Sequence, residues 1–476
     1  MTQERKITRN ILIQILGKVL STLIGLLVVG LITRYLGAKG GFGRYTTVMA
    51  YLQFAGILAD WGLSLVIVQM IAERPEDEEK IVNNIFSFRI ISALCLFMIA
   101  VSLAWLLPYD ALIRIGIAIT AVGFLAISLN QLLIGVFQSK LAMGKVAVAE
   151  IMGRLILLLM TALVVWCDLG LSAILLATTI GALTNFFTNY YFTRKWLQIQ
   201  FVFDPAFWCI IWHKTWPIAL SIIFNLIYFK ADTLILSLSQ DLTDTGLYGA
   251  AYKVLEVLIT LPYLFLGLLL PFMTTYWVKK QTAQFHAIAQ NAFDAMSLMA
   301  LPMVFGAILL GRQIMTLVAG QDFIIAGDIL KILVVATAFI FLSNVFTHII
   351  VAIDAQKKIL PGFIVVAVVA LTGYLIFIPR YSYWAAAWMT VVSEGLILMI
   401  AAMVVSHLTH FRPQLKTFLK ALFASLIMSG IIWAFMFLHA PFLITFFGAV
   451  VSYPLLLILF GVVSKKFVFD IVKLKN

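Results

Sequence analysis

The stretch ILIQILGKVLSTLIGLLVVGLI, residues 11–32, decides the class of fold. A helix needs about 20 predominantly apolar residues to cross the hydrocarbon core of a bilayer, and this run meets that length with Lys18 as its only charged member. It is too long for the hydrophobic region of a cleavable signal peptide, and further apolar runs follow it directly. The stretch therefore predicts a membrane-spanning helix and no leader.

Composition extends this prediction to the whole chain. The 476 residues are 63% hydrophobic and 11% charged, whereas soluble domains carry about 25% charged residues. The net charge of +12 comes from short basic clusters between apolar runs, which is typical of topology signals and not of nucleic-acid binding. Three distant cysteines and six scattered histidines show no disulfide or metal-ligand spacing. We expect no metal, no cofactor and no nucleic-acid partner.

Apolar runs long enough to span a membrane recur along the entire sequence, separated by short connections. We therefore expect an all-α polytopic membrane protein with about fourteen transmembrane helices. The expected spans are residues 11–33, 43–71, 84–107, 111–137, 146–167, 170–193, 212–238, 245–277, 288–310, 325–353, 359–379, 383–407, 416–438 and 441–463.

The basic residues set the orientation. Lys and Arg concentrate in both terminal segments and in alternate connections, including Lys140, Arg194 and Lys195. Because cytoplasmic loops carry an excess of Lys and Arg, we expect both termini in the cytoplasm.

An internal repeat organises the spans. The second expected span begins with Gly43-x-Tyr45 and the eighth with Gly246-x-Tyr248, six helices later, so the two units share one orientation. Two parallel six-helix lobes are typical of transporters built around a central cavity. We predict an N-terminal lobe over residues 1–195, a second lobe over 196–410, and two additional helices with a cytoplasmic tail over 411–476.

Polar residues inside the spans form stripes at helical spacing. Charges at membrane depth cost about 2.5–3.5 kcal/mol each on insertion scales, and they usually face a cavity or a partner. Lys18, Thr22 and Gly25 share one face of the first span, and Glu150 and Arg154 one face of the fifth. These stripes indicate a hydrated pathway, although Glu150 with Arg154, or Lys253 with Glu256, could equally neutralise each other.

Four segments carry a family resemblance: YLGAKGGFGRYTTV from residue 35, ADWGLSLVIVQ from 59, YFKADTLILS from 228 and TGLYGAAYKVLE from 245. The chain resembles, over essentially its whole length, the polysaccharide (O-antigen type) flippases of the multidrug/oligosaccharidyl-lipid/polysaccharide exporter superfamily. The residues that match its motifs are Gly37, Gly43, Tyr45, Asp60, Gly62, Leu63, Asp232, Gly246, Tyr248, Ala251 and Lys253. Relatives commonly have Arg where this chain has Lys230, and Lys acts as a point charge where Arg grips a phosphate bidentately.

The resemblance implies a flippase of the cytoplasmic (inner) membrane that translocates undecaprenyl-pyrophosphate-linked oligosaccharide across it by alternating access, for cell-surface polysaccharide synthesis. Basic residues inside the spans would then attract the anionic head group, and acidic ones would carry a coupling ion. The candidates are Lys18, Arg89, Arg154, Lys230 and Lys253 for the substrate, Asp60 and Glu394 for the ion, and Arg34, Arg44 and Arg312 at the periplasmic mouth. Arg89 could instead snorkel to the interface, and the last three could be interfacial anchors.

The implied partners are the lipid-linked oligosaccharide, membrane lipids, and the polysaccharide polymerase with its chain-length machinery. An ion-coupled multidrug antiporter of the same superfamily is the alternative, which an acid-dominated cavity and twelve helices would favour. A membrane-embedded polymerase or ligase is a third possibility, but the external connections are too short for a catalytic loop. We therefore expect a transporter and not an enzyme.

Overall fold

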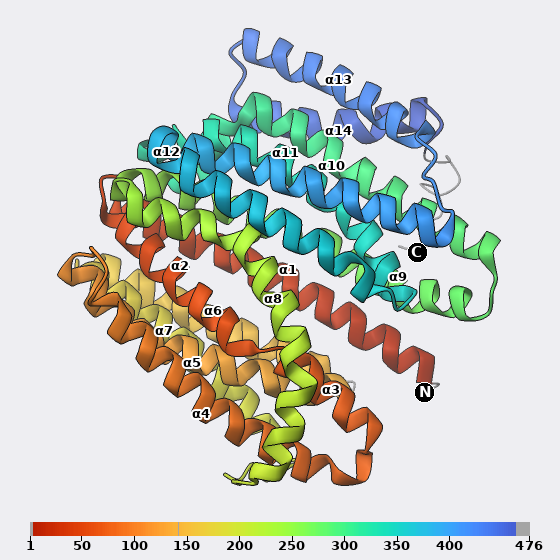
Figure 1. Ribbon diagram of the computed structural model, residues 1–476. Helices are drawn as coiled ribbons and strands as arrows, with labels where there is room; N and C mark the ends of the chain where they lie inside the picture. The colour runs from red at the N-terminus through yellow and green to blue at the C-terminus, as the bar shows by residue number, and fades with distance from the viewer. Residues whose placement is uncertain (1–2, 141, 463–476) are drawn as a thin grey trace. The chain divides into compact units, whose positions relative to one another are not determined.

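Helices account for all regular secondary structure in the residues that the computed structural model describes, 3–140 and 142–462 (Figure 1). The last part of the predicted cytoplasmic tail, residues 463–476, lies outside this range. In chain order the elements are α1 Gln3–Leu36, α2 Gly41–Asp60, α3 Leu63–Glu73, the 3-10 helix η1 Pro75–Asp77, α4 Glu78–Ala104, α5 Ala111–Ser139, α6 Met143–Trp166, α7 Gly170–Thr193, α8 Pro205–Ser239, α9 Leu242–Val278, α10 Thr282–Ala319, η2 Gln321–Phe323, α11 Ala326–Ala352, α12 Gln356–Thr409, α13 Lys416–Phe437 and α14 Phe442–Leu459.

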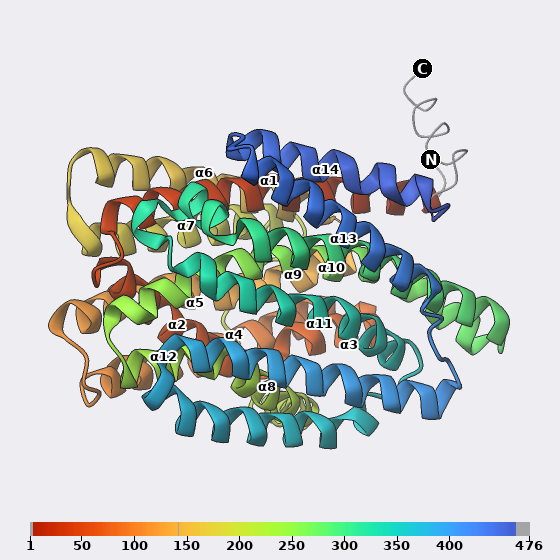
Figure 2. The ribbon, with the colours of Figure 1, turned by 90° about the horizontal axis from the view of Figure 1, so that it is seen from above.

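The number of membrane spans agrees with the sequence. Eleven of these helices are long and apolar enough to cross a membrane, counting α12 once. The 54-residue α12 leaves helical geometry at Ser382 (φ 50°, ψ −137°), and its two limbs fold back on each other, since a Cβ on Gly362 would lie 2.5 Å from Cγ2 of Ile400 (Figure 2). Adding the second limb of α12, the α2–α3 pair and the 35-residue α8 gives fourteen spans. The expected all-α polytopic fold is confirmed.

The second expected span, 43–71, is wrong as one continuous helix. Its helix breaks between α2 and α3, where Trp61 (φ 48°) and Gly62 (φ 76°) both adopt the left-handed conformation. Glycine takes this conformation freely, but a residue with a Cβ pays about 1–2 kcal/mol. The packing of the Trp61 ring on Trp212 of α8, with ring centroids 5.1 Å apart, helps to hold the break in place.

The chain divides into two compact units. The first consists of Met1–Gly249, Val318–Asp322 and Leu371–Ala386, and the second of Ala250–Leu317, Phe323–Ala370 and Ala387–Asn476. Compactness alone does not define bodies that move as lobes, so the division at residues 195 and 410 stays a prediction.

Close helix contacts order the first unit. α6 packs between α1 and α7, and α5 packs between α2 and α7 (Figures 1 and 2). Glycines allow these approaches: a Cβ on Gly17 of α1 would lie 2.6 Å from the Cβ of Ala147 on α6, and one on Gly153 of α6 would lie 2.8 Å from the Cβ of Asn185 on α7. Small residues are what lets helices approach in a membrane. This packing places the polar stripes of α1 and α6 side by side.

The second unit has a core of its own, formed by buried apolar side chains of α9, α10, α11 and both ends of α12. α13 and α14 pack together and against α10, where Met428, Ile432 and Leu457 join Leu310 in one cluster. The Tyr453 hydroxyl of α14 donates to the Leu298 carbonyl of α10 at 2.9 Å, which attaches this last helix pair to the unit.

Candidate functional site

The polar face of α1 meets α6 through an ion pair. Lys18 Nζ lies 2.8 Å from Glu150 Oε1, and the Ser21 hydroxyl donates to the same oxygen at 2.8 Å. Lys18 has no acidic neighbour along its own helix, and its partner comes from α6. The side chains of Lys18 and Glu150 are 39% and 24% exposed, so the pair lies at an accessible surface of the unit. The charge of Lys18 is therefore already balanced.

Arg154 is the second cation of this face, and none of the ion pairs among the described residues includes it. One turn beyond Glu150 on α6, it is exposed, and a Cβ on Gly25 of α1 would lie 3.7 Å from its Cζ. The guanidinium thus extends across α1 at the glycine of the predicted stripe. Within the described part of the chain, no carboxylate lies within ion-pair distance of Arg154, and Glu150, one turn away on the same helix, forms its ion pair with Lys18. Arg154 is therefore available to an external anion.

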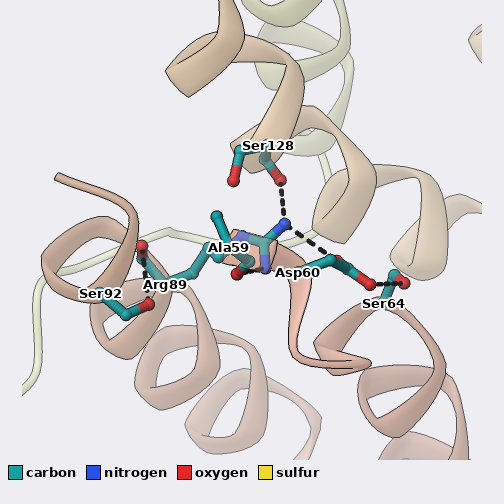
Figure 3. Close-up of polar contacts among 6 residues, drawn as sticks. All are labelled: Ala59, Asp60, Ser64, Arg89, Ser92 and Ser128. Carbon is teal, nitrogen blue, oxygen red and sulfur yellow. Dashed lines mark hydrogen bonds and ion pairs between the residues drawn. The ribbon is translucent and has the colours of Figure 1, made fainter. Parts of the chain in front are cut away.

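Arg89 lies in a different setting, at the break between α2 and α3 (Figure 3). Its guanidinium donates to the carbonyl of Ala59, to Asp60 Oδ1 at 2.9 Å and to the Ser128 carbonyl of α5 at 3.4 Å. The Ser64 hydroxyl of α3 completes the network by donating to Asp60 Oδ2 at 2.9 Å. Arg89 is 1% exposed, so it does not snorkel to an interface. In this conformation its guanidinium is engaged by the end of α2 and by the backbone of α5.

Asp232 of α8 is fully buried and binds its own chain. It accepts from the backbone N–H of Thr233 at 2.6 Å and from the Tyr248 hydroxyl of α9 at 2.5 Å. Tyr248 belongs to the repeat motif, so one of the two repeated tyrosines hydrogen-bonds a buried carboxylate. Lys230, two residues before Asp232, is only partly buried.

The repeated glycines touch each other. A Cβ on Gly246 of α9 would lie 2.9 Å from the backbone nitrogen of Gly43 on α2, and one on Gly43 would lie 1.7 Å from the Leu242 carbonyl oxygen. Three residues on, a Cβ on Gly249 would lie 2.3 Å from Cγ2 of Thr46. Only glycine allows backbones this close. The sequence identified both glycines as equivalent positions of the repeat, but it did not indicate that they contact each other where α2 and α9 cross.

The candidates of the second unit pair locally or are buried. Lys253 Nζ lies 2.8 Å from Glu256 Oε2 on the same helix, as one of the sequence alternatives expected. Glu394, on the second limb of α12, is 4% exposed, and among the described residues no cation lies within ion-pair distance of it. A buried carboxylate of this kind is costly unless it is protonated or binds a cation.

The three arginines expected at the periplasmic mouth are all bound to their own chain. Arg34 donates to the carbonyls of Gly30 and Val318, and Arg44 pairs with Asp110 at 2.6 Å. Arg312 forms a bidentate pair with Asp328, with N–O distances of 2.8–3.0 Å. Neither acidic partner was predicted from the sequence. A signal was available for Asp110, which caps the N-terminus of α5 at Ile113, but not for Asp328.

Comparison with known proteins places the chain in a family. The family model described as "Polysaccharide biosynthesis protein" matches residues 7–277, more than half of the sequence. The chain belongs to this family. The resemblance to polysaccharide flippases drawn from the sequence is thereby confirmed at the level of the family.

One curated relative of this chain is the "probable low-salt glycan biosynthesis flippase Agl15" of Haloferax volcanii. The two are 24% identical over 213 residues, and the match covers 44% of each chain, so it spans less than half the length of that relative.

Two solved structures share the fold. The lipid II flippase MurJ in an inward closed conformation matches 94% of this chain and 98% of its own, with a TM-score of 0.79 at 16% identity. An inward-facing multidrug resistance MATE family transporter of the MOP superfamily matches 84% of this chain and 99% of its own, with a TM-score of 0.63 at 14% identity. At these identities the likeness establishes the polytopic fold and not the substrate.

Proposed function

We propose that this protein is a flippase that moves an undecaprenyl-pyrophosphate-linked oligosaccharide between the leaflets of the cytoplasmic membrane for surface polysaccharide synthesis. Membership of the polysaccharide biosynthesis family supports the pathway, and the fold is shared with a lipid II flippase. The observation that carries the proposal is Arg154, an exposed cation inside a membrane helix with no carboxylate partner among the described residues. A charge kept at that depth is by default part of a substrate or ion pathway.

The chemistry of Arg154 fits a pyrophosphate. A planar guanidinium binds phosphate oxygens through two parallel hydrogen bonds, which gives both energy and orientation. Lys18, which lies on the same polar face, would add a second positive charge for the pyrophosphate once its ion pair with Glu150 opens. Lys230 and Lys253 stay candidates for later contacts along the path. We assign Arg89 the role of a positioning residue, because its guanidinium is committed to the end of α2.

Transport of this kind needs a driving gradient, and we propose Glu394 as the residue that carries the coupling ion. Glu394 is buried and unpaired with any described cation, so protonation or cation binding would stabilise it. Asp60, the other candidate, already holds the guanidinium of Arg89. A Glu394→Gln variant should uncouple transport from an imposed proton or sodium gradient, whereas unchanged coupling would exclude this residue.

An ion-coupled antiporter for small molecules is the second candidate, because MATE transporters share the fold. Two observations favour the flippase. The MATE structure is matched over 99% of its own length but covers only 84% of this chain, whereas the MurJ structure covers 94% of it. This chain also has the helix pair α13–α14 after its first twelve spans. A membrane polymerase or ligase is disfavoured because the longest connection between described helices is only residues 194–204.

The proposal extends to location and partners. The distribution of Lys and Arg supports a cytoplasmic position for both termini, and the flipped substrate would pass to a polymerase and its chain-length machinery.

Gene deletion with complementation tests the function. Deletion should abolish surface polysaccharide and accumulate its lipid-linked precursor, and the wild-type gene should restore both. Arg154→Gln should restore little, Arg154→Lys more, and the matched control Lys214→Gln, at an exposed ion pair with Glu73, should restore fully. A deletion strain with unchanged surface polysaccharide and precursor, and with new drug susceptibility, would favour the antiporter instead.

A further inference from the structure

A cleft of about 570 Å³ opens in the second unit at the end of α12, lined by none of the candidate residues discussed so far. Ser406, His407, His410 and Arg412 form its polar part, while Phe346 of α11 and Met403 of α12 belong to its apolar part. Its volume lies in the range of about 300–1,000 Å³ that is typical of ligand sites.

The polar part of the cleft is basic. His407, His410 and Arg412 are exposed, and within the described residues none of them pairs with an acid. Three neighbouring side chains that carry or can accept positive charge, with a serine hydroxyl beside them, match a phosphate group better than any cation or neutral ligand.

The backbone under this basic cluster is fixed. His410 ends α12 in the left-handed conformation (φ 55°), with its N–H donating to the Ser406 carbonyl at 3.0 Å. The next N–H, of Phe411, donates to the Thr409 hydroxyl at 3.2 Å, and His286 of α10 hydrogen-bonds the Thr409 carbonyl at 2.9 Å. Non-glycine residues held in this conformation often mark functional sites. The cluster is therefore presented by a tethered turn.

The position of the cleft, at the end of an apolar helix long enough to span a membrane, favours a lipid as its occupant. The turn directly follows the apolar α12, so its basic side chains lie where the helix leaves the hydrocarbon, and Met403, 63% exposed, lies two turns back into it. A phospholipid has the same layout, with a phosphate at the surface and acyl chains below. Basic pockets between membrane helices on the cytoplasmic side are known binding sites for anionic lipid head groups.

We propose that this cleft binds an anionic phospholipid of the adjacent leaflet. Arg412, His407 and His410 hold its phosphate, and one acyl chain lies along Met403 and Phe346. Because Arg412 belongs to the connection that leads into α13, the bound lipid joins the end of α12 to the start of the α13–α14 pair. This site is independent of the transport proposal.

Native mass spectrometry of delipidated protein titrated with dioleoylphosphatidylglycerol, and separately with dioleoylphosphatidylcholine, tests the site. The wild type should bind one phosphatidylglycerol in preference to phosphatidylcholine. Arg412→Gln should weaken this binding about tenfold, equivalent to about 1.4 kcal/mol, and Arg412→Lys should weaken it less. Lys279→Gln removes another exposed positive charge, outside the cleft, and should leave binding unchanged.

A second variant separates binding from folding. Ser406→Trp fills the cleft without removing a charge and should also abolish the preference for phosphatidylglycerol. The lipid-free unfolding temperatures of all variants show whether each still folds. The proposal is overturned if both cleft variants fold and bind phosphatidylglycerol like the wild type, if Lys279→Gln weakens binding equally, or if inorganic phosphate competes as well as the lipid.

Discussion

Replacing Arg89 by methionine should destabilise the first unit strongly. Methionine keeps the apolar stem but removes the guanidinium that donates hydrogen bonds to Asp60 and to the carbonyls of Ala59 and Ser128. Removing one partner of a buried ion pair costs about 3–5 kcal/mol, because the other charge stays buried and unpaired. Since the side chain of Asp60 is 19% exposed and keeps its bond from Ser64, we expect the lower end, about 3 kcal/mol.

The matched control is Lys214→Met. Its ion pair with Glu73 has a similar N–O distance, 2.6 Å, but the two side chains are 34% and 45% exposed, so its loss should cost about 0–1 kcal/mol. Free energies of unfolding would be measured by titrating the purified protein in mixed micelles with dodecyl sulfate. The double variant Arg89→Met/Asp60→Asn should cost less than the sum of its single variants, since no unpaired charge remains.

Two outcomes would refute a structural role for Arg89. Arg89→Met could prove no more destabilising than Lys214→Met, or it could leave stability intact while abolishing transport. The second result would return Arg89 to the substrate pathway that the sequence proposed for it.

The remaining predictions concern packing, titration and binding. Gly246→Val should prevent correct folding, seen as loss of monodisperse protein on gel filtration, because its side chain would meet the backbone of α2; Gly430→Val, with open space around it, should be tolerated. Burial raises the pKa of Tyr109 to about 12. The stability that the neutral Tyr109 contributes should therefore be complete below pH 10 and be lost as the pH rises from 10 through 12. The free energy of unfolding of Tyr109→Phe should lack this pH dependence. Arg154→Gln should weaken binding of undecaprenyl pyrophosphate to purified protein about tenfold, whereas Glu150→Gln should not weaken it; equal losses would argue against a direct phosphate contact.

The sequence predicted the helices because the insertion of a segment into a membrane depends on the length and polarity of that segment alone. A span such as residues 11–32 is recognisable from its own length and polarity, and so are the fourteen spans together. The break at Trp61 and Gly62 could not be predicted in this way, since both residues occur inside an apolar run and only tertiary contacts select the left-handed conformation there.

Partners between helices could not be predicted from spacing along one helix. Lys18 looked unpaired because its carboxylate, Glu150, belongs to α6, and Arg89 looked accessible because Ala59 and Ser128 offer only backbone carbonyls. The polar stripe that contains Arg154 was predicted, but spacing along one helix could not show that Glu150 pairs with Lys18 and that no described carboxylate pairs with Arg154.

The central claim, that this chain flips a lipid-linked oligosaccharide, is tested most directly in proteoliposomes. Undecaprenyl-pyrophosphate-linked oligosaccharide with a fluorescent sugar label would be placed in both leaflets, and a membrane-impermeant quencher added outside. In vesicles with the wild-type protein, we predict that the quenched fraction of the fluorescence exceeds the fraction of label that starts in the outer leaflet. Vesicles with Arg154→Gln should reach this level much more slowly. Wild-type vesicles that quench no further than protein-free vesicles, under any imposed proton or sodium gradient, would contradict the account.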